Sequence, residues 1–134
     1  MHVLDTNILI HAFNRSRPDF SDRMSAELLA DRPLFVPTIG LYELEYGFAR
    51  GNRRTSNQAI LTALMDEGLR ELAFNRRDAQ IAGEIRAVLE RSGTPIGPYD
   101  LLIAAQSMRV GATLVTLNRR EFDRVPGILV TDWG

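Results

Sequence analysis

The sequence contains no cysteine and no lysine, and only two of its 134 residues are histidine. The absence of cysteine excludes disulfide bonds, thiolate metal sites and a cysteine nucleophile. The two histidines, His2 and His11, are too few for a histidine-rich zinc site. No apolar run approaches the roughly 20 residues that cross a bilayer, and Met1 is not followed by a basic and then a long apolar segment. We therefore expect a cytoplasmic protein with no part in a membrane.

Positive charge is not in excess, because the formal net charge is -1. The molecule therefore has no large positive field that would attract nucleic acid from a distance. All 16 basic residues are arginine, and several are close together in the sequence: Arg50, Arg53 and Arg54; Arg76 and Arg77; Arg119, Arg120 and Arg124. Guanidinium groups match phosphate oxygens in pairs, but ordinary solvated faces explain these groups as well, and we give that interpretation more weight.

The length and composition indicate one globular domain spanning residues 1–134, with a single core. Hydrophobic residues make up 45% and charged residues 25% of the chain, which argues against disorder. Apolar runs predict strands at 2–5, 34–37, 69–74, 112–117 and 128–131. Helices are predicted from Thr6-Asn7 through Phe13, from a Ser21 cap to Pro33, from Thr38 to Gly51, from Thr55 or Ser56 to Gly68, from an Asn75 cap to Ser92, and from Gly97-Pro98 to Gly111. This alternation predicts an α/β domain with a mainly parallel sheet of about five strands and helices on both faces.

Three acids follow different strands of this predicted sheet. Asp5 ends the first strand, Glu43 lies near the start of the helix after the second, and Asp100 lies in the first turn of the helix after Gly97-Pro98. Ligands of such sheets bind beyond the carboxyl ends of the strands, so the three carboxylates are expected to meet there. Mg²⁺ prefers oxygen ligands, and a bound Mg²⁺ activates water for phosphodiester hydrolysis.

Each acid also has a plainer explanation, because acids are favoured as helix caps and near helix starts. Glu43 and Asp100, however, have apolar neighbours in the sequence, where an unpaired acid is costly. Taken together, the three acids favour a metal site. A fourth member is expected from the loop after the strand 112–117, and both Asn118 and Glu121 remain candidates. Supporting residues are Thr6 and Thr116, which can orient the acids through their hydroxyl groups, and Asn7.

Four segments around these residues resemble the PIN domain family, and particularly the VapC toxins of bacterial toxin-antitoxin pairs. They are Val3-Leu-Asp-Thr-Asn-Ile8, Thr38-Ile-Gly-Leu-Tyr-Glu-Leu-Glu-Tyr-Gly47, Ile96-Gly-Pro-Tyr-Asp-Leu-Leu-Ile-Ala-Ala105 and Leu114-Val-Thr-Leu-Asn-Arg-Arg-Glu-Phe122. The resemblance implies a PIN fold and metal-dependent cleavage of single-stranded RNA. It makes Asp5, Glu43 and Asp100 the acids that hold Mg²⁺, for which Mn²⁺ can substitute.

The match departs from the family at the fourth position. Asn118 stands where many members carry aspartate, and an asparagine lacks the charge that would complete a second Mg²⁺ site. Leu117 also replaces a residue that is commonly polar in the family. These departures leave the number of metal ions open.

The resemblance also implies partners. It predicts a homodimer and a small VapB-type antitoxin whose carboxy-terminal segment covers the groove and presents a basic side chain to the acids. The apolar helix 60–65 could supply a partner surface. The closing segment 124–133 resembles the branch that cuts initiator tRNA, which favours tRNA, and its anticodon stem-loop, as the substrate whose cleavage inhibits translation.

Other functions fit the sequence less well. Asn118 and the absence of a basic field suggest a catalytically weak, PIN-like RNA-binding module as the main alternative. A haloacid-type phosphotransferase also places an aspartate after its first strand, but Asp5-Thr-Asn7 lacks the second acid that such enzymes use. A nucleotide-binding domain is disfavoured because no glycine-rich phosphate loop follows Asp5.

Overall fold

A single parallel sheet forms the centre of the molecule. The computed structural model describes residues 1–134 and contains five strands in the order β3-β2-β1-β4-β5. The strands are β1 (His2–Leu4), β2 (Leu34–Pro37), β3 (Arg70–Leu72), β4 (Thr113–Val115) and β5 (Leu129–Thr131). Every neighbouring pair is parallel, which confirms the predicted α/β architecture and strand number.

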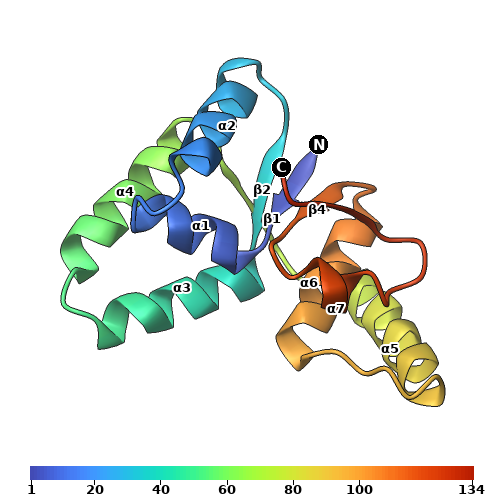
Figure 1. The fold of residues 1–134 in the computed structure, drawn as a ribbon. Coiled ribbons are helices and arrows are strands. Elements are labelled where there is room, and N and C mark those ends of the chain that lie inside the picture. The colour runs from blue at the N-terminus through green and yellow to red at the C-terminus, as the bar shows by residue number, and fades with distance from the viewer.

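Seven helices cover the two faces of this sheet. They are α1 (Thr6–Phe13), α2 (Pro18–Leu29), α3 (Thr38–Arg50), α4 (Arg54–Asp66), α5 (Arg76–Arg91), α6 (Pro98–Arg109) and α7 (Arg119–Phe122). Helices α1 to α4 lie on one side and α5 to α7 on the other, with the sheet between them (Figure 1). No helix combines the length and the apolar character required to span a membrane.

The sheet divides the apolar interior into two clusters. Successive strand residues point to opposite faces, so Val3 and Leu114 join the cluster under α5 and α6, whereas Leu4 and Val115 join the cluster under α1 to α4. Each cluster contains 13 buried residues. A parallel sheet buried on both faces requires this division, which replaces the single core expected from the chain length.

Most helix ends follow the predicted signals, but two starts do not. Asn75 caps α5 in a reciprocal capping box with Asp78, and Gly111, with a φ of +68°, ends α6 in the left-handed conformation that glycine adopts freely. Helix α2 begins at Pro18, because the fixed φ of proline suits the first helical position, so Ser21 lies inside the helix and is not its cap. Helix α4 begins at Arg54, just before the predicted start.

Ile39, Tyr42, Tyr46 and Ala49 repeat at helical spacing and so predict the inner face of α3, but this prediction is wrong. The buried stripe consists of Gly40, Leu44 and Phe48, while Tyr42 and Tyr46 are exposed. Leu44 and Phe48 lie four residues apart on the side that faces α1 and α4, so they take the apolar contacts. On α4, Ile60 to Met65 also pack into this cluster, so these apolar side chains do not form the free partner surface that the sequence suggested.

Two acids that the sequence analysis did not single out are buried away from the strand ends. The carboxylate of Asp78 accepts the backbone N–H of Asn75 and forms an ion pair with Arg109, while its own backbone N–H donates to the Asn75 side chain. Glu27 on α2 is 2% exposed and accepts hydrogen bonds from Arg23 at 3.1 Å and Arg32 at 2.5 Å. Burial alone would raise the pKa of Glu27, but the two guanidinium groups outweigh burial and lower it.

Replacing Glu27 by glutamine is expected to destabilise the fold by about 1–3 kcal/mol at neutral pH, because the charged acceptor of both arginines is lost. A lowered folded-state pKa contributes stability above the unfolded value of about 4.5, and this contribution disappears as the pH falls through the folded value. Urea denaturation of both proteins from pH 7 to pH 3 should therefore show two curves that converge at acid pH. A constant gap across this range would contradict the ionic explanation.

Candidate functional site

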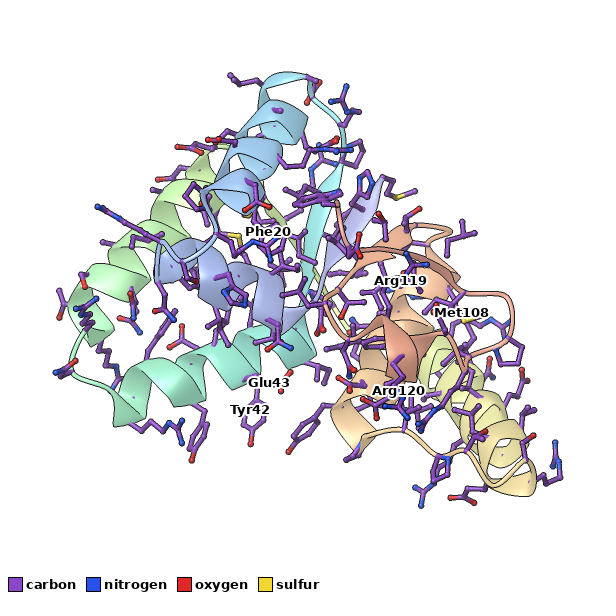
Figure 2. The ribbon with its side chains drawn as sticks, in the orientation of Figure 1. Phe20, Tyr42, Glu43, Met108, Arg119 and Arg120 are labelled. Carbon is purple, nitrogen blue, oxygen red and sulfur yellow. The ribbon has the colours of Figure 1, made fainter.

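The order in which strands are added to the sheet reverses at β1, and the candidate site lies at this point. From β1 the chain continues to β2 on one side, whereas β4 and β5 are added on the other. The helices that follow these strands diverge there and leave a crevice at the carboxyl ends. A cavity of about 390 Å³ lies at this place, and its lining includes Asp5, Thr6, Asn7, Glu43, Asp100 and Asn118. Figure 2 shows Glu43 projecting from α3 toward the space between the two halves of the molecule.

Asp5 is held at the bottom of the crevice by two hydrogen bonds. Its Oδ1 accepts the backbone N–H of Thr6 at 2.8 Å, and its Oδ2 accepts the hydroxyl of Thr116 at 2.7 Å. Asp5 is therefore also the N-cap of α1, which begins at Thr6 as predicted. Burial raises the pKa of Asp5 despite these bonds, and the charge of Glu121 adds to the effect.

The two threonines connect the acids to the backbone. Thr116 also accepts the backbone N–H of Asn118 at 3.0 Å, so its hydroxyl is fixed while it donates to Asp5. Thr6 donates its hydroxyl to Oε1 of Glu43 at 2.9 Å. Gly40 allows this contact, because a Cβ at that position would lie 3.2 Å from the Thr6 hydroxyl oxygen. The carboxylates of Asp5 and Glu43 are thus held in fixed orientations.

Negative charge accumulates in the crevice. Glu43 is half-buried, and burial together with the charge of Asp5 raises its pKa although Thr6 donates to it. The pKa of Asp100 rises to about 8, first through burial, then through a hydrogen bond with Glu121, and then through the charges of Asp5, Glu121 and Glu43. Without a counterion, Asp100 therefore holds a proton at neutral pH.

Glu121 and Asn118 form one unit beside Asp100. The hydrogen bond with Asp100 lowers the pKa of Glu121 despite the opposing effect of burial, and the backbone N–H of Gly97 donates to the same carboxylate at 2.6 Å. Asn118 donates its amide to Glu121 at 2.5 Å and lies 3.5 Å from Oδ2 of Asp100. Asn118 lines the cavity and Glu121 supplies charge behind it, so both candidates for the fourth position lie next to Asp100.

The chemistry of these groups fits a hard divalent cation. Apart from Arg50, the charged groups that line the cavity are the carboxylates of Asp5, Glu43 and Asp100, and the pKa of each is raised, first by burial and then by neighbouring negative charge. As placed, no three acidic or histidine side chains are close enough to hold one ion together. Mg²⁺ nevertheless needs only one or two protein carboxylates, because it keeps several waters and binds substrate phosphate.

Six of the lining residues were not predicted as members of the site: Ile10, Gly47, Tyr42, Tyr46, Tyr99 and Arg50. The three tyrosines have no charge that would point to a site, and Arg50 looks like one of the surface arginines near Arg53 and Arg54. A signal was present in the sequence, since Tyr42 directly precedes Glu43 and Tyr99 directly precedes Asp100. Arg50 lies one helical turn after Tyr46, and its guanidinium carbon lies 5.3 Å from the centre of that ring.

Comparison with known proteins identifies the family to which this fold and its acidic crevice correspond. The family model described as PIN domain matches residues 2–128. The chain belongs to the PIN domain family. This assignment confirms the resemblance inferred from the four sequence segments, and the matched range includes every acid of the crevice.

Several relatives resemble this PIN domain over nearly its full length. Ribonuclease VapC2 of Rickettsia felis is 34% identical over 134 residues, covering 99% of this chain and 98% of the relative. The tRNA(fMet)-specific endonuclease VapC of Salmonella typhimurium is 35% identical over 131 residues, covering 98% and 96%. The crystal structure of DNA-bound VapBC from Salmonella typhimurium contains a chain with a TM-score of 0.88 and 34% identity, covering 99% of this chain and 98% of that one.

Proposed function

We propose that this protein, a single PIN domain over residues 1–134, is a VapC-type toxin that cleaves RNA as a metal-dependent endoribonuclease. The observation that carries the proposal is the cavity at the strand ends, where Asp5, Glu43 and Asp100 face one space. Full-length similarity to a ribonuclease and to a tRNA(fMet)-specific endonuclease supports it. We take initiator tRNA, cut in its anticodon stem-loop, as the favoured substrate, which means that the protein acts in the cytoplasm and stops translation.

Mg²⁺ would be held between Asp5, Glu43 and Asp100, with one or two of these carboxylates as direct ligands and the rest acting through its waters, and Mn²⁺ would substitute because it accepts the same oxygen ligands. An ion bound there would supply a water of lowered pKa and positive charge beside the phosphate that is hydrolysed. Thr116 and Thr6 keep the carboxylates of Asp5 and Glu43 in fixed orientations for this task. Glu121 compensates for the missing charge of Asn118, because it places a carboxylate within hydrogen-bond distance of the Asn118 amide and beside Asp100.

The same charges suggest how the activity is restrained. We propose a VapB-type antitoxin that covers the cavity and presents a basic side chain to the acids, and a homodimer of the toxin within that complex. A solved relative is a DNA-bound VapBC assembly, which supports a partner of this kind. A cation from the partner would stabilise the ionised form of Asp100, whose pKa is raised by burial, by the hydrogen bond with Glu121 and by the neighbouring acids.

The proposal predicts a discrete cut in initiator tRNA after the protein is induced in cells. Sequencing of the 5′ ends of cellular RNA should show one new end within the anticodon loop, and growth should stop. The purified protein should give the same cut in Mg²⁺ or Mn²⁺ and none in EDTA. The matched control is the Asp5→Asn variant, which should give neither the cut nor the arrest. RNA that is bound but intact would instead favour the binding module.

A further inference from the structure

All three tyrosines of the chain lie at one place, around the acidic cavity. Tyr42 is 56%, Tyr46 58% and Tyr99 43% exposed. The other aromatic residues, six phenylalanines and one tryptophan, are all buried or partly buried. Exposed Phe, Tyr or Trp rings therefore occur only at this cavity, where the three tyrosines keep apolar ring surface in contact with water.

Two of these rings meet across the cavity. Tyr42 extends from α3, and Tyr99 belongs to α6; these two helices also carry Glu43 and Asp100. Their ring centres are 5.6 Å apart at an interplanar angle of 63°, so one ring presents its edge to the other. Both side chains remain exposed to solvent in this arrangement. Each exposed ring is adjacent in sequence to an acid of the site, so a group stacked on it would lie beside that acid.

The charge of the site favours RNA binding through the exposed rings over binding through phosphate groups. The cavity is lined by carboxylates, and the whole chain carries a net charge of -1, so phosphate attraction contributes little to RNA binding. Arg50 is the one basic residue among the lining side chains, and it lies over the ring of Tyr46. Stacking of bases on aromatic rings does not depend on attraction between opposite charges and accepts every base.

We propose that Tyr42 and Tyr99 form a stacking platform for an unpaired nucleobase of the RNA, next to the phosphate that is cut. This inference rests on the proposed function. It gives a physical reason why that function would require single-stranded RNA. A base within a duplex is already stacked on its neighbours, whereas a loop base can turn outward onto an aromatic ring. The platform thus selects loops by shape, and Arg50 at the other end of the cavity contacts a neighbouring phosphate.

The test uses an RNA hairpin that contains the mapped cut, with a single abasic nucleotide placed at each loop position in turn. Tyr42→Ala and Tyr99→Ala should each raise KM about tenfold or more, with little change in kcat. Tyr42→Phe and Tyr99→Phe keep the ring and should behave like the unmodified protein. Leu129→Ala, which removes an exposed apolar side chain from β5, is the matched control outside the cavity. The thermal unfolding temperature should be similar in all variants, because each substituted side chain is exposed to solvent.

The abasic series separates stacking from a structural effect. For the unmodified protein, removal of the base at one loop position should raise KM by a similar factor. At that position the alanine variants should show no further rise in KM, because both changes remove the same contact. Normal cleavage by both alanine variants, or losses that add at every position, would overturn the platform and leave the nuclease assignment intact. Absence of any cleavage by the unmodified protein would overturn the proposed function and the platform with it.

Discussion

Replacing Asp5 or Asp100 by asparagine is expected to slow RNA cleavage by about a thousandfold or more. Asparagine keeps the size of the side chain but removes the negative charge that holds the metal ion. Cleavage of a labelled hairpin under single-turnover conditions in Mg²⁺ measures the effect. Asp123→Asn makes the same change on an exposed residue just after α7, outside the cavity, and should cleave at the normal rate.

The same two variants should fold at least as well as the unmodified protein when metal is absent. The pKa values of Asp5 and Asp100 are raised in the folded state, so at neutral pH folding must either keep the carboxylate ionised against burial or add a proton to it, and both oppose folding. Asparagine needs neither, so each substitution removes this opposition, which is the usual trade between activity and stability. Urea denaturation in EDTA should show equal or higher midpoints. Retained cleavage in both variants would refute the metal site, and loss of folding would refute the electrostatic argument.

Replacing Arg109 by alanine is expected to destabilise the protein by about 3–5 kcal/mol, the largest loss of stability that we predict. Arg109 extends from the last turn of α6 and donates to Asp78, which is 0% exposed, at 2.5 Å, and to the backbone carbonyl of Ala73 at 3.1 Å. Without the guanidinium, the carboxylate remains in the interior with only its cap contacts. Denaturation in urea at pH 7 measures the change.

An exposed ion pair provides the control for this prediction. Arg86 and Glu90 lie four residues apart on the outer face of α5, and both are largely in solvent, so Arg86→Ala should change stability little. The double variant Asp78→Leu with Arg109→Met should recover much of the loss, because apolar groups of similar size replace a buried pair without leaving a charge alone. If Arg109→Ala and Arg86→Ala lowered the free energy of unfolding by the same amount, burial would not be what makes the Arg109–Asp78 pair important for stability.

The position of the acids could be predicted because it follows from local signals. Asp5 directly follows an apolar strand, and Asp100 follows Gly97-Pro98, which marks a helix start. In a parallel sheet, strand ends and helix starts share one edge, so the topology brings distant acids together without any knowledge of their contacts. The sheet, its strand number and six of the seven helices follow from the same alternation.

The remaining features depend on packing that the sequence pattern does not show. Tyr42 and Leu44 are both apolar enough to face a core, and only the contacts with α1 and α4 decide that Leu44 is inside. Helix α7 has four residues, too few to show a helical period. Glu27 and Asp78 look like ordinary surface acids, since their arginine partners are recognisable only once the chain has folded.

The hydrogen bond between Thr116 and Asp5 joins residues 111 positions apart. During synthesis, a growing chain contains Asp5 and Glu43 early, but it lacks the Thr116 hydroxyl and the Asn118–Glu121 unit until β4 and the residues just after it have been added. The proposed activity therefore requires synthesis through at least Glu121. A fragment that stops before β4 has neither the group that orients Asp5 nor the residues beside Asp100.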